Sequence, residues 1–171
     1  MSKRDLKKYL KELDKAQLQE QIMELYDKFI PVKTYYDFVF NPKEDKLLEE
    51  CKIKISNEYF PVRGKKAKAR RSVAQKYIKH FISLGVDSFI IADVMLYNIE
   101  IALTYSSSKI VKQELFFKSM LTSYEQAVSY LIQNGILSDF KSRVVAIKEE
   151  VLTQNWVNSY EFNAIVERLE Y

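Results

Sequence analysis

A run of basic side chains in the middle of the chain is the feature best suited to chemistry. Between Glu58 and Asp87 there is no acidic residue, and this window holds eight Lys/Arg together with the only histidine, His80. Like charges this close repel one another, and water, counter-ions or an anionic partner relieve the repulsion. We therefore predict that the window binds an anion, through Arg63, Lys65, Lys66, Lys68, Arg70, Arg71, Lys76 and Lys79.

A helix start next to this run strengthens the prediction. The spacing in Ser72-Val73-Ala74-Gln75 is that of a capping box and predicts a helix over Val73–Leu84, with Gly85 just past its end. The first N–H groups of a helix have no partner and attract anions. Arg70 and Arg71 are therefore expected to converge with the helix start on a phosphate or a carboxylate.

The kind of partner stays open at this point. An acidic protein surface would meet the charge, and so would a nucleic acid, whose bases could stack on Tyr59, Phe60 and Tyr77. A solvated loop without any ligand is the third alternative. Residues 1–82 hold 20 Lys/Arg against 12 Asp/Glu, whereas residues 83–171 hold 7 against 11. This asymmetry also fits docking between copies of the chain, so a homo-oligomer is a further alternative.

Two carboxylates within an apolar stretch form a second candidate site. Asp93 and Glu100 are seven residues apart, which places them on one face of a helix, with Asn98 also inside the stretch. Such a polar stripe either reaches the surface or pairs with Lys/Arg of a neighbouring helix. A carboxylate metal or acid–base site of an enzyme is the remaining alternative. Di-iron bundles use Glu-x-x-His pairs, and this sequence has none.

The single cysteine and the single histidine complete the reactive residues. Cys51 has no second cysteine for a disulfide, which fits a reducing, cytoplasmic setting. A catalytic Cys51–His80 pair is conceivable by residue type, but Cys51 falls at an inward position of its expected helix. We expect no cofactor and no metal.

The composition predicts what positions these residues. With 47% apolar residues but only three glycines and three prolines, the chain is expected to be all-α, a single domain over residues 1–171. It should contain seven to nine helices, arranged as an irregular bundle or a short solenoid-like array. The most apolar helix, from Asp87 to Tyr105 and broken by Ser106–Ser108, should be central. Its most apolar stretch, Phe89 to Tyr105, is too short and too polar to span a membrane, and we expect no membrane partner.

Apolar spacing and caps predict the other helices. Asp14 and Gln17 have capping-box spacing, Asn41 should cap a helix that begins at Pro42, and Gly135 should follow another. Four aromatic residues near the C-terminus are expected in core or dimer packing: Trp156, Tyr160, Phe162 and Tyr171. The remaining helices are predicted near residues 6–13, 18–29, 35–40, 42–57, 109–134, 139–153 and 158–169.

Three segments give the chain a resemblance. It resembles a bacterial family of short all-helical proteins known only as a domain of unknown function, through Asp5-Leu6-Lys7-Lys8-Tyr9-Leu10, through the stretch from Lys33 to Asp45, and through Arg70-Arg71-Ser72-Val73-Ala74-Gln75-Lys76-Tyr77. The resemblance covers essentially the whole chain. It implies a bacterial, single-domain protein and carries over no site residue.

The function that these patterns favour is that of a non-enzymatic, cytoplasmic interaction module. Its basic segment, residues 63–79, would engage an anionic partner. Nucleic-acid binding through the same segment is the main alternative. An enzyme that uses Asp93 and Glu100 is the weaker one.

Overall fold

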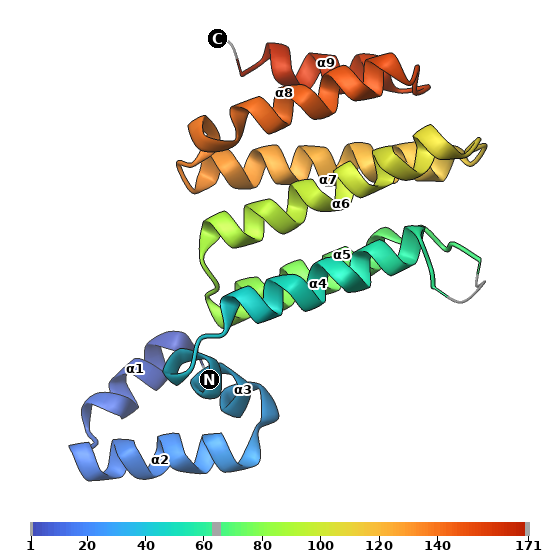
Figure 1. Cartoon of the computed structure of the whole chain (residues 1–171). Coiled ribbons are helices and arrows are strands. Elements are labelled where there is room, and N and C mark those ends of the chain that lie inside the picture. Colours follow the sequence, from blue (N-terminus) through green and yellow to red (C-terminus); the bar gives the residue numbers. More distant parts are fainter. Residues whose placement is uncertain (1, 63–65, 170–171) are drawn as a thin grey trace. The chain divides into compact units, whose positions relative to one another are not determined.

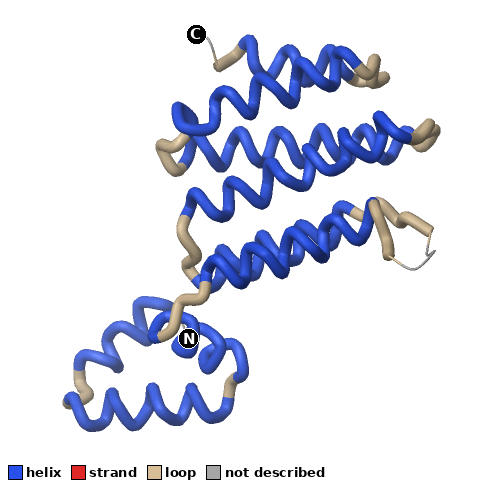
Figure 2. The backbone as a smooth tube through the Cα atoms, viewed as in Figure 1, coloured by secondary structure: helices blue, strands red, loops and turns tan. Residues whose placement is uncertain are grey.

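The computed structural model describes residues 2–62 and 66–169, and within these residues the secondary structure is entirely helical. This confirms the expected all-α fold and its helix count (Figure 1, Figure 2). The nine helices of the described residues are α1 (Lys3–Lys11), α2 (Lys15–Lys28), α3 (Ile30–Phe40), α4 (Glu44–Tyr59), α5 (Arg71–Leu84), α6 (Ser88–Ser108), α7 (Glu114–Gln133), α8 (Leu137–Thr153) and α9 (Ser159–Glu167).

The chain divides into two compact units, Met1–Lys43 and Glu44–Tyr171. The N-terminal unit contains α1 to α3, in which α2 packs against α3 and the Tyr26 hydroxyl donates to Asp37 Oδ1 at 2.8 Å. The C-terminal unit contains α4 to α9. The single domain expected over residues 1–171 stays a prediction.

The C-terminal unit is a stack of three antiparallel helix pairs, α4–α5, α6–α7 and α8–α9 (Figure 1). Within the stack, α4, α6 and α8 form one layer, and α5, α7 and α9 form the other (Figure 2). Each helix packs on its partner and on the next helix of its own layer. This is the arrangement of a short solenoid-like array, in which neighbouring pairs bury one continuous core.

The central helix is α6, as its apolar sequence predicts. It packs against α4, α5, α7 and α8, and nine of its residues are buried. Asp87 caps its start by accepting the N–H of Phe89 at 2.7 Å. The expected break at Ser106–Ser108 is wrong, because α6 runs to Ser108. The hydroxyls of these three serines donate to the carbonyls three residues earlier, at 2.9–3.1 Å, which stabilises the last turn instead of ending it.

Length and composition alone would allow α6 to cross a membrane. It has 21 residues rather than the shorter stretch expected, and its most apolar window reaches a mean hydropathy of 1.3. Half of that window is buried inside the fold. The core helix of a globular unit meets the same criterion, and the position of α6 between four other helices accounts for its composition.

The helix ends agree with the capping signals at some positions and not at others. Asp14 and Gln17 form the predicted capping box, at 2.8 and 3.0 Å, and Gly85 and Gly135 have the positive φ values of +73° and +69° expected after a helix. The caps predicted at Asn41 and Ser72 are wrong. The helix after Asn41 begins only at Glu44, and α5 begins at Arg71, before Ser72.

A candidate anion-binding groove between α4 and α5

A groove of about 640 Å³ lies between α4 and α5, the first antiparallel pair of the C-terminal unit. It contains part of the predicted basic site and is called the α4/α5 groove below. Its walls alternate basic, polar and aromatic side chains from both helices. The lining residues are Lys54, Asn57, Glu58, Arg70, Ser72, Val73, Lys76, Tyr77 and His80.

The free cations of the groove come from both helices. Lys54 of α4 and Lys76 of α5 are exposed, and His80 lies one helical turn after Lys76. Lys79 is also exposed on α5, three residues after Lys76 and so on the same side of the helix. In the described part of the chain no ion pair engages Lys54, Lys76 or Lys79. Their charge is therefore available to a ligand.

One carboxylate of the groove is already paired. Arg70 donates to Glu58 in a bidentate pair, from Nε to Oε2 and from Nη2 to Oε1, both at 2.8 Å. These hydrogen bonds hold the pKa of Glu58 below its ordinary value, although partial burial acts the other way. Since the two charges cancel each other, the positive charge of the groove comes from the lysines.

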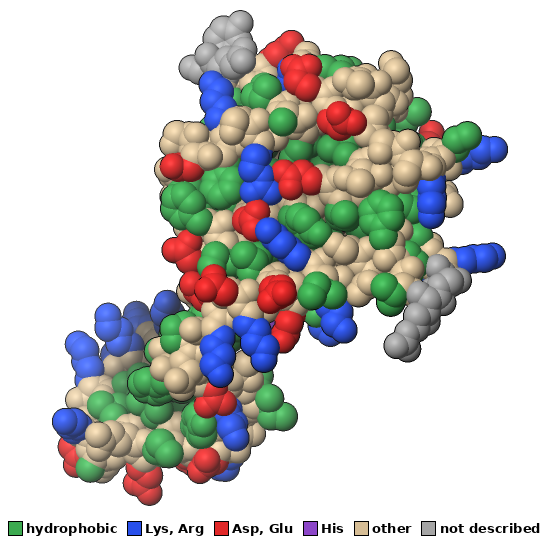
Figure 3. Space-filling model, viewed as in Figure 1, with side chains coloured by type: hydrophobic (Ala, Val, Ile, Leu, Met, Phe, Trp, Pro, Cys, Tyr) green, Lys and Arg blue, Asp and Glu red, His purple; other side chains and the backbone are tan. Residues whose placement is uncertain are grey.

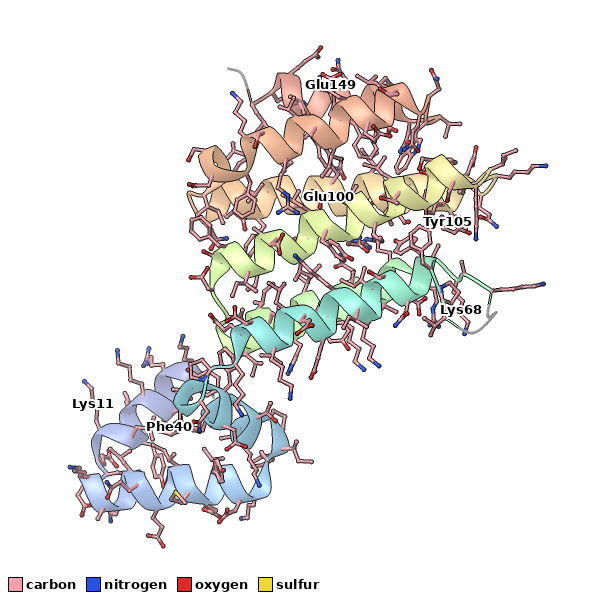
Figure 4. The ribbon with its side chains drawn as sticks, in the orientation of Figure 1. Lys11, Phe40, Lys68, Glu100, Tyr105 and Glu149 are labelled. Atoms are coloured by element: carbon pink, nitrogen blue, oxygen red, sulfur yellow. The ribbon has the colours of Figure 1, made fainter. Side chains whose placement is uncertain are left out.

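Glu58 also fastens the basic loop to the end of α4. Its backbone carbonyl accepts the N–H groups of Lys68 and Ala69, both at 2.9 Å, and Ala69 takes a left-handed φ of +47° to make this turn. Lys66 and Lys68 are exposed on the loop beyond the helix pair, where Figure 4 shows Lys68. Arg63 and Lys65, two of the predicted binding residues, lie outside the described residues. With the loop held in this way, α5 begins at Arg71 and its N-cap residue is Arg70, not the predicted Ser72.

Arg70 and Arg71 do not converge at the start of α5, so that expectation is wrong. Arg70 is bound to Glu58 of α4, whereas Arg71 points to α7. There, Arg71 Nε donates to Ser123 Oγ at 2.8 Å and Arg71 Nη2 donates to Gln126 Oε1 at 2.6 Å. The two side chains therefore leave the start of α5 toward different helices, Arg70 toward α4 and Arg71 toward α7. Partial burial lowers the pKa of Arg71.

This position makes Arg71 a packing residue, and we expect Arg71→Ala to lower the free energy of unfolding by about 1–2 kcal/mol. The change removes two charge-assisted hydrogen bonds and leaves the buried Ser123 hydroxyl without its donor. Urea unfolding followed by circular dichroism measures the loss. Lys79→Ala, on the exposed side of the same helix, should stay within about 0.5 kcal/mol. Equal losses for both variants would contradict the assignment.

The start of α5 adds donors to the groove. Arg70 is its N-cap residue, and within the described residues no side chain caps this helix start. Ser72, in the first turn, lines the groove. The first backbone N–H groups and the positive end of the helix dipole therefore add to the field of Lys54 and Lys76. This arrangement can hold a carboxylate or a phosphate.

The Cys51–His80 pair is not a catalytic pair in this structure. Cys51 is fully buried, and burial raises the pKa of its thiol to about 12, so the nucleophilic thiolate is not populated near neutral pH. His80 is exposed at the groove. Cys51 is thus the core residue that its helix position predicts.

Asp93 and Glu100 belong to an ion cluster on the layer of α4, α6 and α8. Arg143 donates to both oxygens of Glu100, at 2.9 and 2.8 Å, and to Asp93 Oδ1 at 2.7 Å. Lys52 approaches the other oxygen of Asp93 at 2.6 Å. Figure 4 shows Glu100 midway along α6, and Figure 3 shows basic and acidic side chains alternating across this face. The ion cluster therefore consists of Lys52, Asp93, Glu100 and Arg143.

The ion cluster decides between the interpretations of these two carboxylates. The side chains are partly buried, with exposed fractions of 23% for Asp93 and 35% for Glu100. Asp93 is paired with Lys52 of α4 and Arg143 of α8, and Glu100 is paired with Arg143. The interhelical ion pair is therefore the interpretation that the structure shows, and an unpaired stripe at the surface is wrong. Across the described ranges no group of three or more His, Cys, Asp or Glu side chains could hold a metal ion.

Lys54 and Asn57 are groove residues that the sequence did not indicate. They precede the acid-free window, and nothing in their local pattern marks them. Only the antiparallel pairing of α4 with α5 brings them opposite Lys76. A helical projection of α4 together with that pairing could have found them, because Lys54 and Asn57 are three residues apart and share a face.

Comparisons with known proteins add a family but no activity. A family model described as a family of unknown function, DUF6155, matches residues 1–170. No curated protein and no solved structure matches the chain. The matched range includes all the helices of both units. The bacterial origin that the resemblance implied stays a prediction. On the extent of this match, the chain belongs to the family of unknown function DUF6155.

Proposed function

We propose that this protein is a non-enzymatic helical interaction module whose α4/α5 groove binds an anionic partner. The observation that supports the proposal is the groove itself, which Lys54, Lys76 and the uncapped start of α5 line together, and whose lining carboxylate, Glu58, is paired with Arg70. The basic segment of residues 63–79 contributes through its helical part, with Lys66 and Lys68 on the adjoining loop. A cytoplasmic setting fits the single, buried Cys51.

An acidic protein surface suits this groove better than a nucleic acid does. The carboxylate of Glu58 lies among the cations, and Glu50 on α4 pairs with Lys46 nearby, so the positive charge forms a short patch and not a continuous track. Of the three rings predicted to stack on bases, Tyr59 is fully buried and Phe60 is exposed but does not line the groove. Tyr77 lines the groove, but it is partly buried and packs edge-on against Phe81, with ring centroids 6.3 Å apart. Nucleic acid remains the second candidate because Tyr77 and the lysines line one groove.

The test uses defined probes and the double variant Lys54→Gln, Lys76→Gln. Wild-type protein should bind an oligoglutamate peptide more tightly than single-stranded or double-stranded DNA of similar charge, in titrations at low and moderate salt. The variant should bind about tenfold more weakly, because each exposed charge pair contributes a fraction of a kcal/mol up to about 1 kcal/mol. Its affinity should also depend less on salt.

The matched control removes the same charge from another part of the same unit. Lys118→Gln with Lys141→Gln, both at exposed positions of α7 and α8, should leave the affinity unchanged. If DNA binds more tightly than the peptide and the groove variant flattens the salt slope, the nucleic-acid candidate replaces the first one. If the groove variant and the control bind equally well, the groove is not the site.

A further inference from the structure

Helix α1 is a short amphipathic helix with a well-fixed start. The Ser2 hydroxyl accepts the N–H of Asp5 at 3.3 Å, and the Asp5 carboxylate accepts the N–H of Ser2 at 3.0 Å, so the two residues form a capping box. These hydrogen bonds hold the pKa of Asp5 below its ordinary value. The capping box favours helix from Lys3 onwards, although the helix has only nine residues.

Apolar and basic side chains occupy separate, adjoining arcs around α1. At about 100° per residue, three apolar side chains fall within an arc of about 100°, and five basic side chains fall within the next arc of about 140°. The two acidic residues, Asp5 and Glu12, lie in the remaining sector. The apolar arc consists of Leu6, Tyr9 and Leu10, and the basic arc of Lys3, Arg4, Lys7, Lys8 and Lys11. Figure 3 shows basic side chains gathered over α1.

The apolar arc is open. Leu6, Tyr9 and Leu10 have exposed fractions of 41%, 45% and 37%. In the described part of the N-terminal unit, α2 and α3 pack against each other, whereas α1 packs closely against neither and is tied to α2 through the bond from Gln21 to the Tyr9 hydroxyl. None of the described residues of this unit is fully buried. An apolar arc left open in this way marks a contact surface.

We propose that α1 docks on an anionic lipid surface, with its apolar arc in the headgroup region and its basic arc on the lipid phosphates and carboxylates. A helix with adjoining cationic and apolar arcs lies in the plane of the interface, and four to eight basic side chains on such a helix are typical of binding to anionic lipid. This surface belongs to the N-terminal unit and is independent of the α4/α5 groove.

Charge and apolar surface together select lipid over the other occupants. A nucleic acid would satisfy the five cations but would leave the leucines in water. A second copy of α1 would cover the leucines but would bring two basic arcs together, which costs free energy. The expectation that the chain has no membrane partner depended on the lack of a segment that spans a membrane. A helix that lies in the interface needs no such segment.

The test is flotation of the full chain with vesicles of phosphatidylcholine, with and without phosphatidylserine. The protein should bind the anionic vesicles at low salt, lose affinity as salt is raised, and ignore pure phosphatidylcholine. Lys7→Gln with Lys11→Gln should weaken binding on the order of 30-fold, because each basic side chain near the surface contributes about fivefold. Leu6→Ser with Leu10→Ser should weaken it at least about tenfold. Circular dichroism verifies that both variants are folded.

Two control variants distinguish α1 from the basic side chains elsewhere on the protein. Lys15→Gln with Lys28→Gln, on α2 of the same unit, should keep full lipid binding. The groove variant Lys54→Gln with Lys76→Gln should also keep full lipid binding. Its effect on binding of the oligoglutamate peptide tests the proposed function separately.

The proposal fails if the protein does not bind phosphatidylserine vesicles at low salt, or if the α2 control loses as much affinity as the α1 variant. It also fails if the leucine variant binds normally, since charge alone would then account for the adsorption. Loss of self-association in ultracentrifugation on changing Leu6 and Leu10, without loss of lipid binding, would assign the arc to a second copy. DNA binding that needs Lys7 and Lys11, without vesicle binding, would assign it to nucleic acid.

Discussion

Replacing Phe162 by alanine is expected to lower the free energy of unfolding by about 4 kcal/mol. Phe162 of α9 is fully buried, and its ring lies 4.9 Å from that of Tyr124 on α7 and 5.9 Å from that of Trp156. Trp156 in turn contacts Phe116 and Phe117 of α7, at centroid distances of 5.6 and 5.2 Å. Truncation therefore opens a cavity at the centre of an aromatic cluster that holds the last helix pair to α7.

Urea unfolding followed by circular dichroism measures this loss, and the single tryptophan adds a local signal. Trp156 is the only Trp in the chain, so its fluorescence follows the C-terminal unit. The matched control is Tyr160→Ala in the same helix, where the side chain is 70% exposed and the effect should stay within about 0.5 kcal/mol. A loss for Phe162→Ala below about 1.5 kcal/mol would contradict the packing of this aromatic cluster.

The sequence predicts the parts of this fold that depend on neighbours along the chain. The near-continuous apolar character of α6 identified the central helix, and the scarcity of glycine and proline indicated an all-α fold. Of the C-terminal aromatic residues expected in core or dimer packing, Trp156 and Phe162 lie in the core, whereas Tyr160 is exposed and Tyr171 lies outside the described residues. The exact end of α6 could not be predicted, because a serine hydroxyl can either break a helix or bond to its last carbonyls.

The candidate site was predicted only in part, and Arg70 and Arg71 illustrate why. The two residues are adjacent and chemically alike, yet one pairs with Glu58 and the other reaches Ser123, 52 residues further along the chain. Their partners depend on how α5 packs against α4 and α7, which no local pattern encodes. The window has no acidic residue in the sequence, but in the fold Glu58, at its edge, pairs with Arg70 and neutralises that charge.

For the ion cluster, the sequence likewise predicts only the relation between residues of the same helix. A spacing of seven placed Asp93 and Glu100 on one face of α6, and the structure confirms that they share a partner, Arg143. The identity of that partner could not be predicted, because Lys52 and Arg143 come from α4 and α8. Only the layer of the stack brings these helices to opposite sides of α6.

Arg143→Met is expected to cost about 3 kcal/mol of unfolding free energy near neutral pH. The change leaves Glu100 without its cation and Asp93 with Lys52 alone, in partly buried positions where an uncompensated charge is costly. A loss of about 3 kcal/mol is at the low end of the range for removing one partner of a buried ion pair. We expect this low value because the side chains of the ion cluster are up to about one third exposed. Lys141→Met, at an exposed position of the same helix, should change stability by less than about 0.5 kcal/mol.

Two further measurements separate an ionic role of Arg143 from a loss of packing. Burial alone would raise the pKa of Asp93, but hydrogen bonds from Lys52 and Arg143 outweigh it and hold the pKa below its ordinary value. A carboxylate of this kind stabilises the fold above its unfolded pKa, and the contribution is lost as pH falls through the lower, folded pKa. The difference in unfolding free energy between wild type and Arg143→Met should therefore be largest near pH 7 and smaller at about pH 3.

The second measurement adds Asp93→Asn and Glu100→Gln to Arg143→Met. The triple variant should lose less unfolding free energy than the sum of the separate losses, by about 1 kcal/mol or more, because the three side chains form one network. Strict additivity together with a loss independent of pH would show that Arg143 acts by packing alone.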